Sequence, residues 1–133
     1  MACFAQFRGV RGWTDEDMKQ LTEHCFRGKV EKDGHFLFLG KDGTDYPKTQ
    51  FSIHGVKYAF RRHQLSLFLK LAEAGFDMDN WKDSDVASHL CHKKRCYNPD
   101  HLVLEDSGKN KERDTCVAQK TCRGHGDSPD CLL

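Results

Sequence analysis

The last third of this chain concentrates cysteine and histidine: five of the seven cysteines and four of the eight histidines lie between residues 89 and 131. A small domain with a thin core commonly adds cross-links or bound metal, and almost no apolar residues accompany the part from Cys116 to Cys131. An odd number of cysteines does not suit a framework that pairs them all as disulfides. The first residues also lack the apolar stretch of a secretory signal. We therefore expect a reducing compartment, in which clustered cysteine and histidine side chains bind metal, and zinc is favoured over disulfides.

The remaining composition is that of a small polar domain. Its 133 residues are 38% hydrophobic and carry a net charge of +1, which predicts one domain with a thin core. The charge is uneven, because residues 48–70 hold five lysines or arginines and no acid, whereas residues 73–85 hold five acids and one lysine. A local basic strip is typical of nucleic-acid binding even where the net charge is small. No run of 18 apolar residues indicates a membrane span.

Apolar periodicity predicts an α+β domain with an antiparallel sheet. Thr14 precedes three acidic residues and is expected to cap a helix that ends at Gly28. Periodic or alternating apolar residues predict four further elements, which are a strand at 35–39, a hairpin of strands 49–53 and 56–61, and a helix at 65–74. Residues 76–85 are expected to form a polar loop.

The predicted hairpin carries polar side chains suited to DNA contact. Phe51, Ile53 and Ala59 are expected to point to the core, so alternate residues point to solvent or to a ligand. A two-stranded β-ribbon fits the DNA major groove, where lysine, arginine and glutamine contact phosphates and base edges. The candidate DNA contacts are Lys48, Gln50, Ser52, His54, Lys57 and Arg61. Ordinary exposed strand positions explain the same residues, so both interpretations stay open.

Two groups of metal-binding residues follow. The first has five-residue spacing and consists of Cys91, Cys96 and His101. Two thiolates and an imidazole can converge on a tetrahedral zinc ion, and a structural site needs a fourth protein ligand. Cys25, facing inward on the first helix, is the expected fourth ligand. The alternatives for this position are His24 and Cys3.

The second group is complete by itself. It consists of Cys116, Cys122, His125 and Cys131. Three thiolates and one imidazole within a short, polar segment are the ligands of a structural zinc site, and the metal supplies the order that this segment otherwise lacks.

Between the two groups the sequence predicts a strand, a loop, a second strand and a helix. Residues 86–89 and 102–105 are the strands, and a helix opens at Asp106-Ser107. His89 ends the first strand and Asn110 lies on the first turns of the helix, so the two side chains can flank one phosphate. Taken singly, His89 is better explained as a further zinc ligand or a packed core histidine, and Asn110 as a helix-surface residue. The run Lys93–Arg95 suits either a solvated loop or a phosphate contact.

This arrangement resembles the His-Cys box homing endonucleases, a branch of the ββα-metal (His-Me finger) nucleases. The residues that carry the likeness are Ser88-His89-Leu90-Cys91-His92, Arg95-Cys96, Asn98-Pro99, His101-Leu102 and Asn110-Lys111. The likeness is close over residues 86–116, moderate in the cysteine-rich tail, and limited to the order of elements in the first half. The resemblance implies a zinc-stabilised α+β domain with a ββα-metal finger and two structural zinc sites.

The resemblance also implies roles for individual residues. His89 corresponds to the general base that activates water, and Asn110 to the protein ligand of a catalytic Mg²⁺. The implied domain is a single unit over residues 1–133. Within it, 14–85 supply a helix and a DNA-facing sheet, 86–116 the catalytic core, and 116–131 the C-terminal zinc loop.

The implied activity is Mg²⁺-dependent, sequence-specific hydrolysis of double-stranded DNA, with a homodimer as one assembly and the nucleus as the expected compartment. A catalytically silent zinc-box DNA-binding module is the alternative. Retention of both His89 and Asn110 favours the nuclease.

Overall fold

The computed structural model describes residues 13–38, 46–75, 85–126 and 128–132. Within these ranges the chain is α+β, with three α-helices and three separate antiparallel strand pairs. The predicted fold class is therefore confirmed, although the described strands form three ribbons and not one sheet. The polar loop predicted at 76–85 lies outside the described residues except for its last position. No helix in the described part of the chain has the length and apolarity to cross a membrane.

Helix α1 (Asp15–Phe26) begins where the sequence predicts. The Thr14 hydroxyl accepts a hydrogen bond from the Asp17 amide, and the Asp17 carboxylate accepts one from the Thr14 amide, which forms a capping box. Leu21 and Cys25 are fully buried on the inner face of the helix. Gly28 follows with a φ of 76°, a conformation that glycine adopts without strain.

A short hairpin of β1 (Lys29–Lys32) and β2 (His35–Phe38) comes next. Strand β1 is exposed throughout, so it has no apolar alternation from which to predict it. Asp33 and Gly34 both have positive φ, of 54° and 81°, as a tight two-residue hairpin turn requires.

The second hairpin joins β3 (Lys48–Ile53) to β4 (Val56–Arg61) through a turn at His54 and Gly55. Burial alternates along β3, with Phe51 and Ile53 facing the core as predicted. Ala59 pairs with Gln50 and lies on the exposed face, so its predicted inward orientation is wrong. Directly paired residues share a face in an antiparallel ribbon, and Gln50 points outward.

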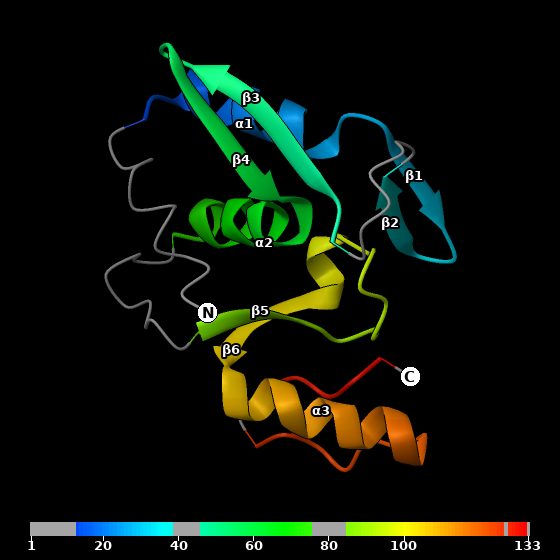
Figure 1. Cartoon of the computed structure of the whole chain (residues 1–133). Helices are drawn as coiled ribbons and strands as arrows, with labels where there is room; N and C mark the ends of the chain where they lie inside the picture. Colours follow the sequence, from blue (N-terminus) through cyan, green and yellow to red (C-terminus); the bar gives the residue numbers. More distant parts are fainter. Residues whose placement is uncertain (1–12, 39–45, 76–84, 127, 133) are drawn as a thin grey trace.

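Helix α2 (Arg62–Glu73) follows β4 without a loop and lies between the β3–β4 hairpin and the third strand pair (Figure 1). It begins three residues before the predicted start, because its first turn is polar although buried. The core between α1, α2 and the hairpin is formed by apolar side chains, including Leu21, Phe51, Phe60, Leu65 and Phe68.

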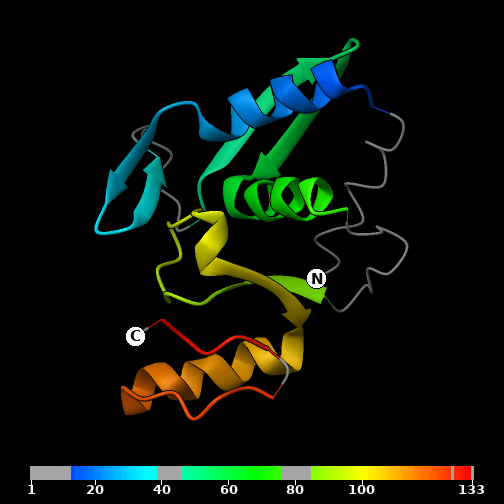
Figure 2. The ribbon, with the colours of Figure 1, turned by 180° about the vertical axis from the view of Figure 1, so that it is seen from behind.

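The third strand pair carries the last helix. Strand β5 (Asp85–His89) pairs with β6 (Leu102–Asp106), with His89 opposite Leu102. Between them lies a loop that ends in the short 3-10 helix Pro99–His101. Helix α3 (Ser107–Gln119) packs on this pair at the end of the molecule away from the β3–β4 hairpin (Figure 2). The predicted strand–loop–strand–helix order is thus present.

Candidate metal clusters and catalytic pocket

The first cluster of metal-binding residues gathers side chains from three elements. It consists of His35, Cys91, Cys96 and His101, whose ligand atoms all lie within 4.8 Å of one another. The Cys96 sulfur is 3.5 Å from Nδ1 of His101. Zn–S and Zn–N bonds of about 2.3 and 2.0 Å at a tetrahedral angle place two ligand atoms roughly 3.5 Å apart. The buried Nδ1 of His35 has no hydrogen-bond partner within the described ranges. The donor set and its spacing therefore fit zinc.

Hydrogen bonds join the β1–β2 hairpin to the loop that carries the other ligands. The Asn98 side-chain amide donates to the Gly34 carbonyl over 2.7 Å. The Tyr97 backbone amide donates to the Phe36 carbonyl over 2.9 Å. These bonds bracket His35 in sequence, so they bring it to the cluster.

Cys25, the predicted fourth ligand, is not in this cluster, and that prediction is wrong. Its side chain is fully buried in the apolar core, where its thiol donates to the Arg62 carbonyl over 3.7 Å. Burial raises the pKa of Cys25 to about 12, so the residue stays a neutral thiol. Of the two alternatives, His24 stacks on Phe51 at 4.5 Å, and Cys3 lies outside the described residues.

The local environment favours a thiolate at the centre of the first cluster. The Cys91 thiol and then the backbone amide of Asn98 lower the pKa of Cys96 to about 4, against the opposing effect of burial. A thiolate is the form of cysteine that ligates metal, so Cys96 is prepared for a cation before one binds.

The second cluster holds the four residues expected from the sequence. Nε2 of His125 lies 3.4 Å from the Cys116 sulfur, 3.3 Å from Cys122 and 3.4 Å from Cys131. These distances are again close to the roughly 3.5 Å separation of ligands around a tetrahedral zinc ion. Backbone amides, first that of Cys131, lower the pKa of Cys122 to about 7. This cluster therefore also fits a structural zinc ion.

Helix α3 supplies three contacts behind the second cluster. Glu112 lies 3.3 Å from Nδ1 of His125, which orients the imidazole with Nε2 toward the thiols. The Lys109 ammonium donates to the His125 carbonyl over 3.0 Å. Arg113 donates to the Cys131 sulfur over 3.3 Å. Sequence spacing could indicate the ligands, whereas these supporting residues have no local signal.

His89 and Asn110 line one small pocket whose described lining residues include no member of either cluster. The pocket has a volume of about 160 Å³ and lies between the start of α2, strand β5 and helix α3. Its other lining residues come from the segment before β3, the end of β4, the start of α2 and β5, and they include Tyr46, Arg61 and His63. The structure therefore brings the predicted pair together with an arginine.

The imidazole of His89 is held by the backbone. Its Nε2 lies 3.1 Å from the Cys96 carbonyl; a carbonyl only accepts hydrogen bonds, so Nε2 carries the proton and Nδ1 keeps its lone pair. Burial lowers the pKa of His89 to about 4, which keeps the ring neutral near pH 7. A neutral imidazole with one free lone pair can accept a proton, although the lowered pKa makes it a weaker base than an imidazole with a pKa near 7.

Sequence reasoning missed His63 in this pocket. Its ring centroid lies 4.7 Å from that of His89 and 5.1 Å from that of Tyr46. Burial lowers the pKa of His63 to about 2, so His63 is a neutral ring packed against His89. The sequence offered one indication of His63, which is its position directly after the basic residues Arg61 and Arg62. The fold, and not the local sequence, brings His63 close to β5.

The predicted DNA contacts mostly share one face of the β3–β4 ribbon. Paired residues on that face are Lys48 with Arg61, Gln50 with Ala59 and Ser52 with Lys57. His54 does not join them, because it lies in the turn and its Nε2 is 2.9 Å from the Asp17 carboxylate. Arg61 also borders the pocket that His89 and Asn110 line, so the ribbon face runs up to these two residues.

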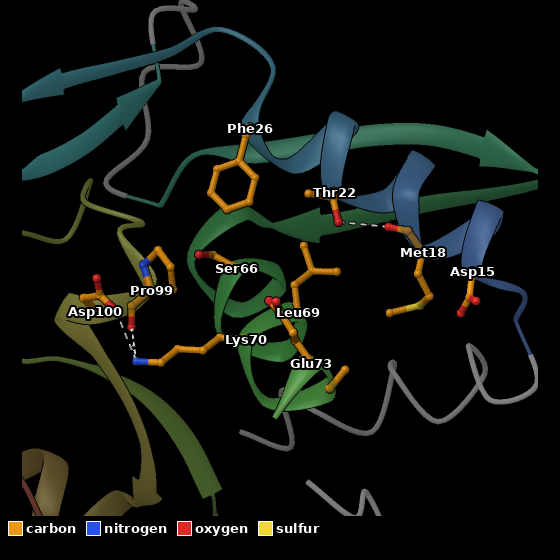
Figure 3. Close-up of a pocket in the computed structure, with 11 residues that line it drawn as sticks. Asp15, Met18, Thr22, Phe26, Ser66, Leu69, Lys70, Glu73, Pro99 and Asp100 are labelled. Carbon is orange, nitrogen blue, oxygen red and sulfur yellow. Dashed lines mark hydrogen bonds and ion pairs between the residues drawn. The ribbon is translucent and has the colours of Figure 1, made fainter. Parts of the chain in front are cut away.

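Two other hollows differ from this pocket. A groove of about 560 Å³ between α1 and α2 is lined mainly by apolar side chains such as Met18, Phe26 and Leu69 (Figure 3). Its charged lining residues include the exposed ion pair of Lys70 with Asp100, and none of the described residues that line it is a histidine or a cysteine. The second hollow has a volume of about 540 Å³ and is bordered by the basic residues Lys32, Lys93, Lys94 and Arg95.

A histidine and an asparagine on a strand–loop–strand–helix unit, flanked by two Cys/His clusters, define the class of zinc-stabilised His-Me finger proteins. A family model of the zinc-binding loop region of homing endonucleases matches residues 24–130. The chain therefore belongs to this family. The family is one of nucleases, which indicates an endonuclease.

Proposed function

We propose that this protein is a Mg²⁺-dependent endonuclease that hydrolyses phosphodiester bonds in double-stranded DNA at specific sequences. The observation that carries the proposal is the state of His89, a partly buried, neutral imidazole whose Nε2 is bonded to the Cys96 carbonyl. That bond leaves Nδ1 as the proton acceptor. Asn110 on the same pocket wall supplies an amide oxygen, which is a ligand type that Mg²⁺ accepts.

The proposed reaction is attack of water on phosphorus. His89 takes one proton from the attacking water, the new P–O bond forms, the bond to the 3′ oxygen breaks, and the leaving 3′ oxygen takes a proton from solvent water. Mg²⁺, when bound by Asn110 and by phosphate oxygens, supplies charge neutralisation at the phosphate. Asn110 is neutral and therefore a weak ligand, so the cation is expected to bind well only together with DNA. Arg61, at the edge of the pocket, is suited to contact the phosphate.

The outer face of the β3–β4 ribbon supports DNA as the substrate. Lys48 and Arg61 are at one end of this face, Ser52 and Lys57 at the other, and Gln50 in the middle. Basic side chains suit phosphates and glutamine suits adenine edges. Because the face leads to the pocket through Arg61, DNA lying on the ribbon can present a phosphate to His89.

The test is cleavage of supercoiled plasmid by zinc-loaded protein with Mg²⁺, compared with His89→Ala, Asn110→Ala and a chelator control. His24→Ala is a matched histidine variant, since its ring stacks on Phe51 outside the pocket. We expect wild type and His24→Ala to cut at discrete positions, and His89→Ala and Asn110→Ala to be inactive.

Three results separate the alternatives. Cleavage that survives in His89→Ala refutes the proposed base. If the wild type yields a smear of fragments and His89→Ala abolishes it, the proposed chemistry is supported and sequence-specific cutting is refuted. Tight, Mg²⁺-independent DNA binding without cleavage, on targets selected from a random library, supports the silent zinc-box module, the second candidate function.

A further inference from the structure

The side chain of Ser88 forms a hydrogen bond with Asn110, the residue proposed to bind the catalytic cation. Ser88 is fully buried in β5, next to His89, and pairs with Val103 of β6. Its hydroxyl donates to Oδ1 of Asn110 over 2.9 Å. Successive residues of a strand point to opposite faces, so Ser88 faces α3 while His89 faces the pocket.

The contact matters because Asn110 is otherwise an exposed residue on a helix. An exposed asparagine samples several rotamers, and rotation of its amide exchanges an oxygen for an NH₂ group that cannot bind a cation. The bond to a rigid, buried hydroxyl restrains that rotation. A carbonyl oxygen has two lone pairs, so Oδ1 keeps one for a cation while it accepts from Ser88.

We propose that Ser88 is a positioning residue that holds the Asn110 carbonyl oxygen in place for a divalent cation. The inference rests on the proposed function, since it deepens the role of Asn110 there. Groups that orient a ligand in this way typically change metal affinity by roughly tenfold or more when they are removed. Ser88 itself touches neither the cation nor the phosphate.

The chain offers a matched control. Ser66 in α2 is also almost fully buried, and its hydroxyl donates to the Tyr97 carbonyl over 2.7 Å. It borders the apolar groove between α1 and α2 and not the catalytic pocket (Figure 3). Ser88→Ala and Ser66→Ala therefore remove the same hydroxyl, with similar burial and a similar hydrogen bond, at different sites.

The first experiment uses neither DNA nor turnover; the cation binds weakly without DNA, so Mn²⁺ is used because even weak, transient binding of this paramagnetic ion broadens nearby signals. In ¹⁵N-labelled, zinc-loaded protein, the side-chain amide signals of Asn110 are followed by NMR while Mn²⁺ alone is added. We expect restrained signals in wild type and Ser66→Ala that broaden at the same Mn²⁺ concentration. In Ser88→Ala the signals should move toward those of a free asparagine, and broadening should need roughly tenfold more Mn²⁺.

The second experiment is plasmid cleavage over a range of Mg²⁺ concentrations. Ser88→Ala should need roughly tenfold more Mg²⁺ for half-maximal cleavage, and Ser66→Ala the wild-type amount. Unchanged Asn110 signals and unchanged Mn²⁺ broadening in Ser88→Ala overturn the inference, as does an equal shift in Ser66→Ala. A wild-type protein that never cleaves, but whose Asn110 signals show the Ser88-dependent response to Mn²⁺, refutes the nuclease and supports the positioning role.

Discussion

The buried ion pair between Arg113 and Glu105 gives the sharpest stability prediction. The Arg113 Nε donates to Glu105 over 2.6 Å and its Nη2 to the second carboxylate oxygen over 3.2 Å. Both side chains are only 2% exposed. Arg113 also donates to the Pro129 carbonyl over 2.8 Å and to the Cys131 sulfur. One guanidinium therefore links β6, α3 and the C-terminal cluster.

Arg113→Met removes the cation and leaves a buried carboxylate without its partner. We expect the free energy of unfolding to fall by about 3 to 5 kcal/mol, the usual result of breaking a buried pair from one side.

The double variant Arg113→Met with Glu105→Leu should recover most of this loss, since no uncompensated charge remains. The part of the free energy of unfolding that is not recovered comes from the lost hydrogen bonds to Pro129 and Cys131, at about 1 kcal/mol each. Urea unfolding of zinc-loaded protein, followed by circular dichroism, measures the full double-mutant cycle. A loss below about 1 kcal/mol in Arg113→Met, or a double variant as unstable as the single one, refutes the reasoning.

Three further predictions address the first cluster, the ribbon and the α1 cap. His35→Ala should lower the zinc content measured by native mass spectrometry from two ions to one, while Cys25→Val should keep both; the opposite pattern would return the fourth ligand to Cys25. Lys57→Ala should reduce the salt dependence of DNA binding, measured by fluorescence anisotropy. The slope of log affinity against log salt concentration should become shallower by about 0.9 if the Lys57 side chain neutralises one phosphate. An unchanged slope would remove Lys57 from the contact set. The hydrogen bond from His54 is the main cause that lowers the pKa of Asp17 in the folded state. The ionised Asp17 should therefore stabilise the fold at pH values above its ordinary pKa. This contribution should be lost as the pH falls through the lowered pKa. The stability difference between wild type and Asp17→Asn should therefore shrink between about pH 5 and pH 2 in urea unfolding, whereas a constant difference would show that this carboxylate is not the titrating group.

The sequence by itself predicted the features that depend on neighbouring residues. The Thr14 cap of α1, the β3–β4 hairpin and the β5–β6–α3 order follow from spacing and local capping, and each is present. The second cluster could also be predicted, because a loop of few residues has little choice about which of its cysteines and histidines meet. The motif around His89 indicated the family, which the match over residues 24–130 confirms.

Only the tertiary structure decided which distant side chains meet. The fourth member of the first cluster is His35 and not Cys25, because hydrogen bonds from Asn98 and Tyr97 attach the β1–β2 hairpin to the ligand loop. A thiol is as good a zinc ligand as an imidazole, so residue chemistry could not distinguish them. The Ser88 contact with Asn110 likewise depends on how α3 packs against β5. Local patterns set which segments form helices and strands, whereas contacts between segments depend on the packing of the whole core, which no short stretch of sequence contains.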